Sequence, residues 1–162
     1  TSGAKLIQDE TVEILWTELF PLVDLITPNI DEAEILTGRK IGSVDGMKQA
    51  CTQMISRGCK AVLLKGGHLI GPVLYDILAQ QRQEILTLKS DYIESKNVHG
   101  TGCTLSAAIA SYMALGHDLQ HAVTYARMYI AGAIEAGKNV TTGKGSGPLN
   151  HSFSPIKMQI KS

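Results

Sequence analysis

Short apolar runs alternate with longer segments of helical periodicity along this chain, and glycine or proline separates most of them. The runs 22–27 and 61–64 have the length and character of buried β-strands. Around them, apolar residues recur at a spacing of three and four, which predicts helices. The expected helices span 9–20, 29–37, 43–57, 104–115 and 118–136. Strands that alternate with helices favour an α/β fold with a mostly parallel sheet and helices on its faces.

The ends of these helices carry recognisable signals. Asp9, Ser43 and Asp118 precede apolar periodic segments and suit the N-cap position, where a side-chain oxygen accepts a bond from a free amide. Gly38 and Gly58 follow such segments and suit the left-handed residue that ends a helix.

The number of strands is low for a complete domain of this class. The runs 73–78 and 84–88 are joined by polar residues and predict an antiparallel ribbon. Only 22–27 and 61–64 have the character of buried parallel strands, whereas a three-layer α/β domain normally has more. We therefore expect residues 1–162 to form the C-terminal part of a single, larger domain whose N-terminal strands are absent from this chain.

The composition of the chain limits the kinds of molecule that it is expected to bind. The 162 residues are 44% hydrophobic and 19% charged, which excludes an intrinsically disordered chain. Fifteen basic and fifteen acidic residues give no net charge, so neither nucleic acid nor an anionic membrane is expected as a partner. Three cysteines without a CxxC spacing do not form a disulfide framework. With no secretory signal visible, a reducing, cytoplasmic location is expected.

The sharpest local feature is the loop Gly100, Thr101, Gly102 and Cys103, which runs directly into a predicted helix. Glycines let the backbone approach a ligand closely, and the first amides of a helix lack partners at the positive end of its dipole. This combination predicts an anion site, although a tight turn with a helix cap explains the same residues. The loop is neither a Walker loop nor a complete dinucleotide fingerprint. The helix start also favours the thiolate of Cys103, whereas Cys51 and Cys59 are expected to be packing residues.

Three other polar residues follow predicted strands. Asn29 and Glu32 stand three apart at a helix start, after the run 22–27, and their oxygens suit Mg²⁺. Helix capping by the same two residues is the alternative. Lys65 ends the run 61–64 and can reach a phosphate, or it is a surface lysine before a loop. The carboxyl ends of parallel strands share one edge, so we expect these residues to converge with the Gly100 loop.

The chain resembles the hydroxymethylpyrimidine/phosphomethylpyrimidine kinases of thiamin biosynthesis, in the ribokinase-like superfamily. The resemblance covers nearly the whole chain, and Thr1-Ser-Gly also matches the family. Its most telling motif is Gly-Thr-Gly-Cys, because most ribokinase-like sugar kinases have Asp at the position of Cys103. The matching segments are 27–34 (Thr-Pro-Asn-Ile-Asp-Glu-Ala-Glu), 65–68 (Lys-Gly-Gly-His), 73–76 (Val-Leu-Tyr-Asp), 99–108 (His-Gly-Thr-Gly-Cys-Thr-Leu-Ser-Ala-Ala) and 143–151 (Gly-Lys-Gly-Ser-Gly-Pro-Leu-Asn-His).

This resemblance implies an ATP- and Mg²⁺-dependent kinase with a three-layer ribokinase-like fold, which is a homodimer when full length. The implied substrates are 4-amino-5-hydroxymethyl-2-methylpyrimidine and its monophosphate. The implied roles are an anion hole at Gly100, Thr101, Gly102 and Cys103, with Cys103 as general base, Mg²⁺ organised by Asn29 and Glu32, phosphate bound by Lys65, and nucleotide beside Gly145 and Gly147.

Two alternatives stay open. The first is a pyridoxal or pyridoxine kinase of the same superfamily, since some of these also carry Gly-Thr-Gly-Cys. The second is a non-catalytic nucleotide-binding module that keeps the fold. Because family members are considerably longer, we expect these 162 residues alone to be inactive without the part that carries most of the substrate pocket.

Overall fold

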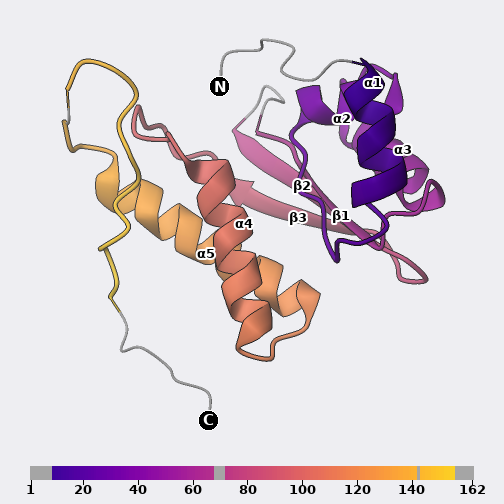
Figure 1. Cartoon of the computed structure of the whole chain (residues 1–162). Helices are drawn as coiled ribbons and strands as arrows, with labels where there is room; N and C mark the ends of the chain where they lie inside the picture. Colours follow the sequence, from indigo (N-terminus) through magenta and orange to yellow (C-terminus); the bar gives the residue numbers. More distant parts are fainter. Residues whose placement is uncertain (1–8, 68–71, 142, 156–162) are drawn as a thin grey trace. The chain divides into compact units, whose positions relative to one another are not determined.

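The computed structural model describes residues 9–67, 72–141 and 143–155. It divides into two compact units, Thr1–Tyr92 and Ile93–Ser162, and each is described by itself (Figure 1). The segments Thr1-Ser-Gly and His68, which belong to the family resemblance, lie outside the described residues.

The first unit contains the N-terminal helices and the sheet. Its helices are α1 (Asp9–Ile14), which continues as the π-helix η1 (Leu15–Leu19), then α2 (Ile30–Thr37) and α3 (Val44–Ser56). The strands are β1 (Ala61–Lys65), β2 (Val73–Gln80) and β3 (Leu86–Asp91). Asn29 caps α2 and Ser43 caps α3 with side-chain oxygens, and Gly38 ends α2 in the left-handed conformation. The predicted starts of these two helices are therefore confirmed.

The sheet corrects the expectation of mostly parallel strands. In the described residues it has three strands in the order β1-β2-β3, and both pairs are antiparallel. The predicted ribbon of β2 and β3 is confirmed. The physical reason for the antiparallel β1–β2 pair is the connection, because residues 66–72 are too few for the helical crossover that parallel neighbours need.

The predicted strand 22–27 is reduced to isolated bridges. Ile26 bridges Val62 in the parallel sense, and Asn29 bridges Lys65 in the same sense. The amide of Leu63 donates to Ile26 O at 2.9 Å, so this segment does run beside β1. Parallel alignment is thus present at the edge of the sheet, without a full parallel ladder.

One face of the sheet carries the core of the first unit. Val62 and Leu64 of β1 and Ile77 and Ala79 of β2 alternate onto that face, where α3 covers them. The helices contribute a further set of fully buried side chains, which includes Met47, Cys51 and Met54. The helical face predicted for residues 43–57 is therefore the buried face of α3.

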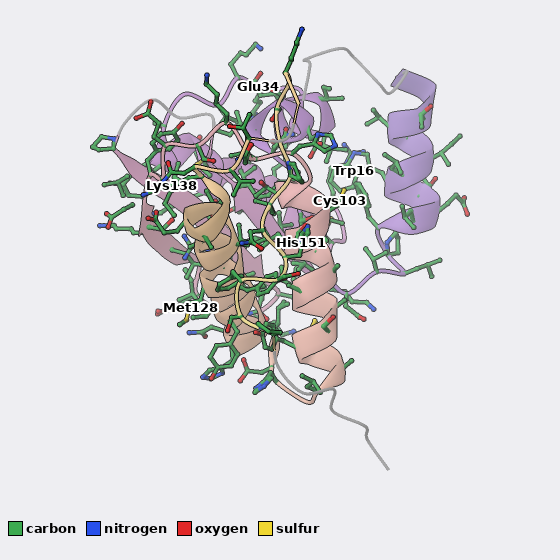
Figure 2. The ribbon with its side chains drawn as sticks, turned by 90° about the vertical axis from the view of Figure 1, so that its left-hand side faces the viewer. Trp16, Glu34, Cys103, Met128, Lys138 and His151 are labelled. Carbon is green, nitrogen blue, oxygen red and sulfur yellow. The ribbon has the colours of Figure 1, made fainter. Side chains whose placement is uncertain are left out.

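The second unit is a pair of packed helices with a C-terminal segment along them. Helix α4 (Thr101–Ala114) is followed by α5 (Leu119–Gly137), which Asp118 caps through the amide of His121. Beyond α5, the chain returns beside it, because Asn150 N donates to Ala133 O and the Tyr129 and Phe153 rings lie 5.4 Å apart. Figure 2 labels His151 on this returning segment. No helix among the described residues is long and apolar enough to cross a bilayer.

Candidate active site

Asn29 and Glu32 form a reciprocal capping box at the start of α2. Asn29 Oδ1 accepts a hydrogen bond from the Glu32 amide at 2.8 Å. Glu32 Oε2 accepts one from the Asn29 amide, also at 2.8 Å. Glu32 is exposed and Asn29 is half-buried, and no other hydrogen bond of either side chain occurs among the described residues. Capping, the alternative left open for this pair, is therefore present, and a metal must share these side chains with the cap.

Lys65 lies directly beside this capping box. Its amide donates to Pro28 O at 2.9 Å, and its backbone bridges Asn29. The side chain is half-buried at the last position of β1. The structure thus brings together two of the strand-end residues that the sequence predicted would meet.

An apolar hollow lies next to the same helix start. It is lined by side chains of η1, α2 and the segment between them, and Glu32 is the charged group of its lining. The other lining residues are Leu15, Phe20, Ile26, Thr27, Pro28, Ile35 and Leu36. Such walls suit an aromatic ring or an aliphatic side chain, and they offer nothing to a phosphate.

In the second unit, Gly100 turns the chain into α4. Its φ of +84° belongs to the left-handed region, which glycine adopts without the strain of a side chain. Gly100 has no side chain to cap the helix. The Thr101 amide donates to Val98 O at 3.3 Å, so the amides of Gly102 and Cys103 are the ones in this first turn without a backbone partner among the described residues. Cys103 is exposed in this first turn, and Figure 2 labels it there. The geometry fits the predicted anion site.

The glycine-rich tail lies beside this loop. The amide of His99 donates to Gly147 O at 3.1 Å, and His99 bridges Pro148. The Ser146 hydroxyl donates to Lys96 O at 2.9 Å. Gly147 is therefore held next to the residue that precedes Gly100, and the exposed Gly145 is two positions away. Two of the predicted site segments, distant in sequence, come together here.

Sequence reasoning missed Asn97, which fastens the approach to the Gly100 loop. Its side chain is 4% exposed, and Nδ2 donates to Gly137 O and to Val140 O, both at 2.6 Å. These carbonyls lie at the end of α5 and just beyond it. Its position three residues before Gly100 was the only signal, and an asparagine in a loop by itself gives no reason to expect burial.

The three cysteines divide as predicted. Burial raises the pKa of the Cys51 thiol to about 12 and that of the Cys59 thiol to about 11. Both are protonated packing residues at neutral pH, whereas Cys103 is exposed. Of the three thiols, that of Cys103 is therefore the one accessible to a ligand, and its chemical role stays a prediction.

The predicted site residues fall into two groups. Asn29, Glu32 and Lys65 lie in the first unit, and the loop 100–103 lies with Gly147 in the second. Each group is assembled within its own unit. The convergence of the two groups at one edge stays a prediction.

Comparison with known proteins identifies the class of protein to which the chain is similar. The bifunctional thiamine biosynthesis protein ThiED of Geobacter sulfurreducens is 44% identical, over 92% of this chain and 30% of that protein. The hydroxymethylpyrimidine/phosphomethylpyrimidine kinase of Rhizobium meliloti is 41% identical, over 93% of this chain and 57% of that enzyme. The chain therefore spans about half the length of this kinase.

A solved structure agrees in fold. The pyridoxal kinase of Staphylococcus aureus in complex with AMP-PCP is 31% identical, with a TM-score of 0.82 over 91% of this chain and 54% of that one. The relatives are thus small-molecule kinases. The model of the phosphomethylpyrimidine kinase family matches residues 1–150, and the chain belongs to this family.

Proposed function

We propose that the protein carrying this chain is an ATP-dependent kinase of 4-amino-5-hydroxymethyl-2-methylpyrimidine and of its monophosphate, in thiamin biosynthesis. The observation that carries the proposal is the start of α4, where the amides of Gly102 and Cys103 have no backbone partner among the described residues and the Cys103 side chain is exposed. Free amides at a helix start bind anions, and phosphoryl transfer depends mainly on positioning and charge stabilisation. Membership of the phosphomethylpyrimidine kinase family supplies the substrate class.

In the proposed mechanism, the loop 100–103 binds the γ-phosphoryl group of ATP through backbone amides, and Lys65 neutralises part of the phosphate charge. The hydroxymethyl oxygen of the pyrimidine forms a bond to the γ-phosphorus while the bond to the β,γ-bridging oxygen breaks. ADP leaves with that electron pair, and the Cys103 thiolate takes the hydroxyl proton. Gly145 and Gly147 border the nucleotide.

Asn29 and Glu32 fit a role in holding Mg²⁺. Amide and carboxylate oxygens are ligands that this ion prefers, directly or through its waters. One carboxylate oxygen of Glu32 is used by the cap, and the side chain is exposed enough to present the other. Bound Mg²⁺ supplies charge neutralisation at the transferring phosphate.

The proposal treats both units as parts of one ribokinase-like kinase domain, with three layers in the full-length protein. We expect that protein to be a cytoplasmic homodimer with a small-molecule substrate and neither nucleic acid nor membrane as a partner. Similarity to the pyridoxal kinase over 91% of the chain supports the shared fold of both units.

A kinase assay tests the proposal directly. The full-length protein that carries this chain is given ATP and Mg²⁺ with the hydroxymethylpyrimidine, its monophosphate or pyridoxal, and ADP release and phosphorylated product are both measured. We expect turnover of the two pyrimidines, and a large loss of kcat in Cys103→Ala with ATP binding retained. Normal turnover by Cys103→Ala would remove Cys103 as the base.

Pyridoxal kinase activity is the second candidate, because the pyridoxal kinase of S. aureus matches the fold with a TM-score of 0.82. Phosphorylation of pyridoxal alone in the same assay would establish it. Binding of ATP with no product from any of the three compounds would instead indicate a non-catalytic nucleotide-binding module.

A further inference from the structure

The motif Val-Leu-Tyr-Asp at 73–76 has no role in the proposed mechanism. Its last residue, Asp76, accepts a hydrogen bond through Oδ1 from the amide of Gly66 at 3.0 Å. Gly66 directly follows Lys65, and Lys65 is the residue paired with Asp76 in the antiparallel register of β1 and β2. Asp76 therefore holds the backbone immediately after the lysine.

The side chains of Lys65 and Asp76 leave the sheet on the same face. Directly paired residues of antiparallel strands project together, with Cβ atoms about 5 Å apart. Their neighbours Leu64 and Ile77 point the other way, into the core beneath α3. The lysine and the carboxylate thus share the face turned away from α3, on which Leu63 and Leu78 are also buried.

The backbone at Gly66 has little room to adjust. A Cβ added to Gly66 would lie 1.9 Å from Tyr75 O, so this residue passes directly against β2. On the other side, the Lys65 amide is bonded to Pro28 O. The Asp76–Gly66 hydrogen bond completes a set of contacts that fixes where β1 ends and in which direction Lys65 leaves it.

We propose that Asp76 is a positioning residue for Lys65, which it orients toward phosphate by holding the Gly66 amide. The inference rests on the proposed function, since it assumes that Lys65 binds the phosphates of ATP. A carboxylate repels phosphate, so Asp76 is not itself a phosphate ligand. Its Oδ1 is committed to the backbone, where a hydrogen bond to a charged acceptor is stronger than one to a neutral acceptor.

Nucleotide binding by calorimetry tests this role, with ATP and adenosine as the two probes. We expect Asp76→Ala to weaken ATP binding about tenfold, the lower end of the range expected for loss of one hydrogen bond to a charged group. Adenosine carries no phosphate, and its affinity should not change. Asp76→Asn keeps an oxygen acceptor for the Gly66 amide and should bind ATP as the unchanged protein does.

A matched control is Asp24→Ala, which removes a carboxylate that pairs with Lys60 just before β1, far along the strand from Lys65. It should leave both affinities unchanged. The double variant Lys65→Ala/Asp76→Ala should bind ATP no more weakly than Lys65→Ala, because Asp76 acts only through the lysine.

Each outcome decides the matter. Wild-type ATP affinity in Asp76→Ala, with weakened binding in Lys65→Ala, overturns the positioning role and leaves the proposed function standing. Additive losses in the double variant overturn it too. Unchanged ATP binding in Lys65→Ala removes the phosphate role of the lysine, and the inference with it. If Asp76→Ala does not fold, loss of ATP affinity in a folded Asp76→Asn shows that the hydrogen bond is not the cause.

Discussion

The side chains of Asn29 and Glu32 each accept a hydrogen bond from the other residue's backbone amide, both at 2.8 Å. This reciprocal cap satisfies two donors at the start of α2. The oxygens proposed to organise Mg²⁺ are therefore part of the helix start, which fixes their direction. Stability and metal binding share the same two side chains, and substitutions can separate them.

Glu32→Gln separates the two roles at this site. Glutamine keeps the capping bond to the Asn29 amide, so the free energy of unfolding should change by less than about 0.5 kcal/mol. The lost charge should abolish much of the gain in ATP affinity that Mg²⁺ provides. Urea unfolding and calorimetry with and without Mg²⁺ measure the two effects.

Ser43→Ala provides the matched control, because the Ser43 hydroxyl accepts from the Gly46 amide and caps α3 away from the site. It should cost about 1 kcal/mol of stability and leave the Mg²⁺ dependence unchanged. A Glu32→Gln protein with undiminished Mg²⁺ dependence would exclude this carboxylate as part of the metal site.

The second prediction concerns the end of β1, where we expect Gly66→Ala to lower the stability of the protein. The added methyl group would lie 1.9 Å from Tyr75 O, and Met47 Cε would be 3.0 Å away. Because the nearest atom belongs to the backbone of β2, the strands must shift, and overpacking of this kind costs about 1–3 kcal/mol. Denaturant unfolding measures the loss.

The neighbouring Gly67→Ala is the control for this substitution, since its Cβ meets no atom within 4 Å. It should unfold at nearly the same denaturant concentration as the unchanged protein. Equal stability of the two variants would contradict the close approach of Gly66 to β2.

Local signals made the helix starts and the turn at Gly100 predictable. Asn29, Ser43 and Asp118 cap their own helices by bonds that span three residues, so the sequence contains both partners of each bond. Gly100 likewise acts on the turn in which it stands. The expectation of a mostly parallel sheet was wrong, because apolar periodicity does not encode strand direction, although the short connection 66–72 could have indicated the antiparallel pairing of β1 and β2.

The contacts that hold the site depend on residues far apart in the chain, and sequence patterns do not show them. Asn97 bonds to Gly137 and Val140, and Asp76 bonds to Gly66 across two strands. Asparagine and aspartate are residue types that usually lie in loops or on the surface, so neither residue type by itself predicts these contacts. Tertiary structure alone determines that these two are fastened to the backbone beside the candidate site.

Thiol reactivity should distinguish the three cysteines. Cys51 and Cys59 are buried, and burial raises the pKa of both thiols, so neither forms thiolate at pH 8. Iodoacetamide at pH 8 should modify one equivalent per chain, at the exposed Cys103. Mass spectrometry of the digested protein locates the label, and Cys103→Ser should take up none. Labelling of Cys51 at a comparable rate in the folded protein would contradict this assignment.

The same two buried thiols predict an alkaline loss of stability. Their pKa values in the folded protein, about 12 for Cys51 and about 11 for Cys59, lie above the unfolded value of about 8.5. The folded state therefore holds protons that the unfolded state has released once the pH exceeds that value. Stability is fully present below about pH 8.5 and falls toward pH 11–12, by up to about 1.4 kcal/mol per pH unit for each thiol.

Urea unfolding at pH 7, 9 and 10 measures this slope. The double variant Cys51→Ala/Cys59→Ala has no thiol to titrate at these positions, so its slope between pH 9 and 10 should be shallower. Its stability at pH 7 will be lower, because the substitutions leave small cavities in the core. Parallel slopes for the two proteins would show that other groups cause the alkaline loss.

The last prediction concerns Asn97, whose buried side chain donates hydrogen bonds to two carbonyl oxygens. In Asn97→Asp, a carboxylate replaces the amide and cannot donate to Gly137 O or Val140 O, so both carbonyls lose a partner of 2.6 Å. A buried negative charge then faces two carbonyl oxygens, and we expect the free energy of unfolding to fall by about 3 kcal/mol. The exposed Asn139→Asp makes the same chemical change on the surface and should alter stability by less than about 0.5 kcal/mol. Equal effects of the two substitutions in denaturant unfolding would show that Asn97 does not fasten α5 to the approach of the Gly100 loop.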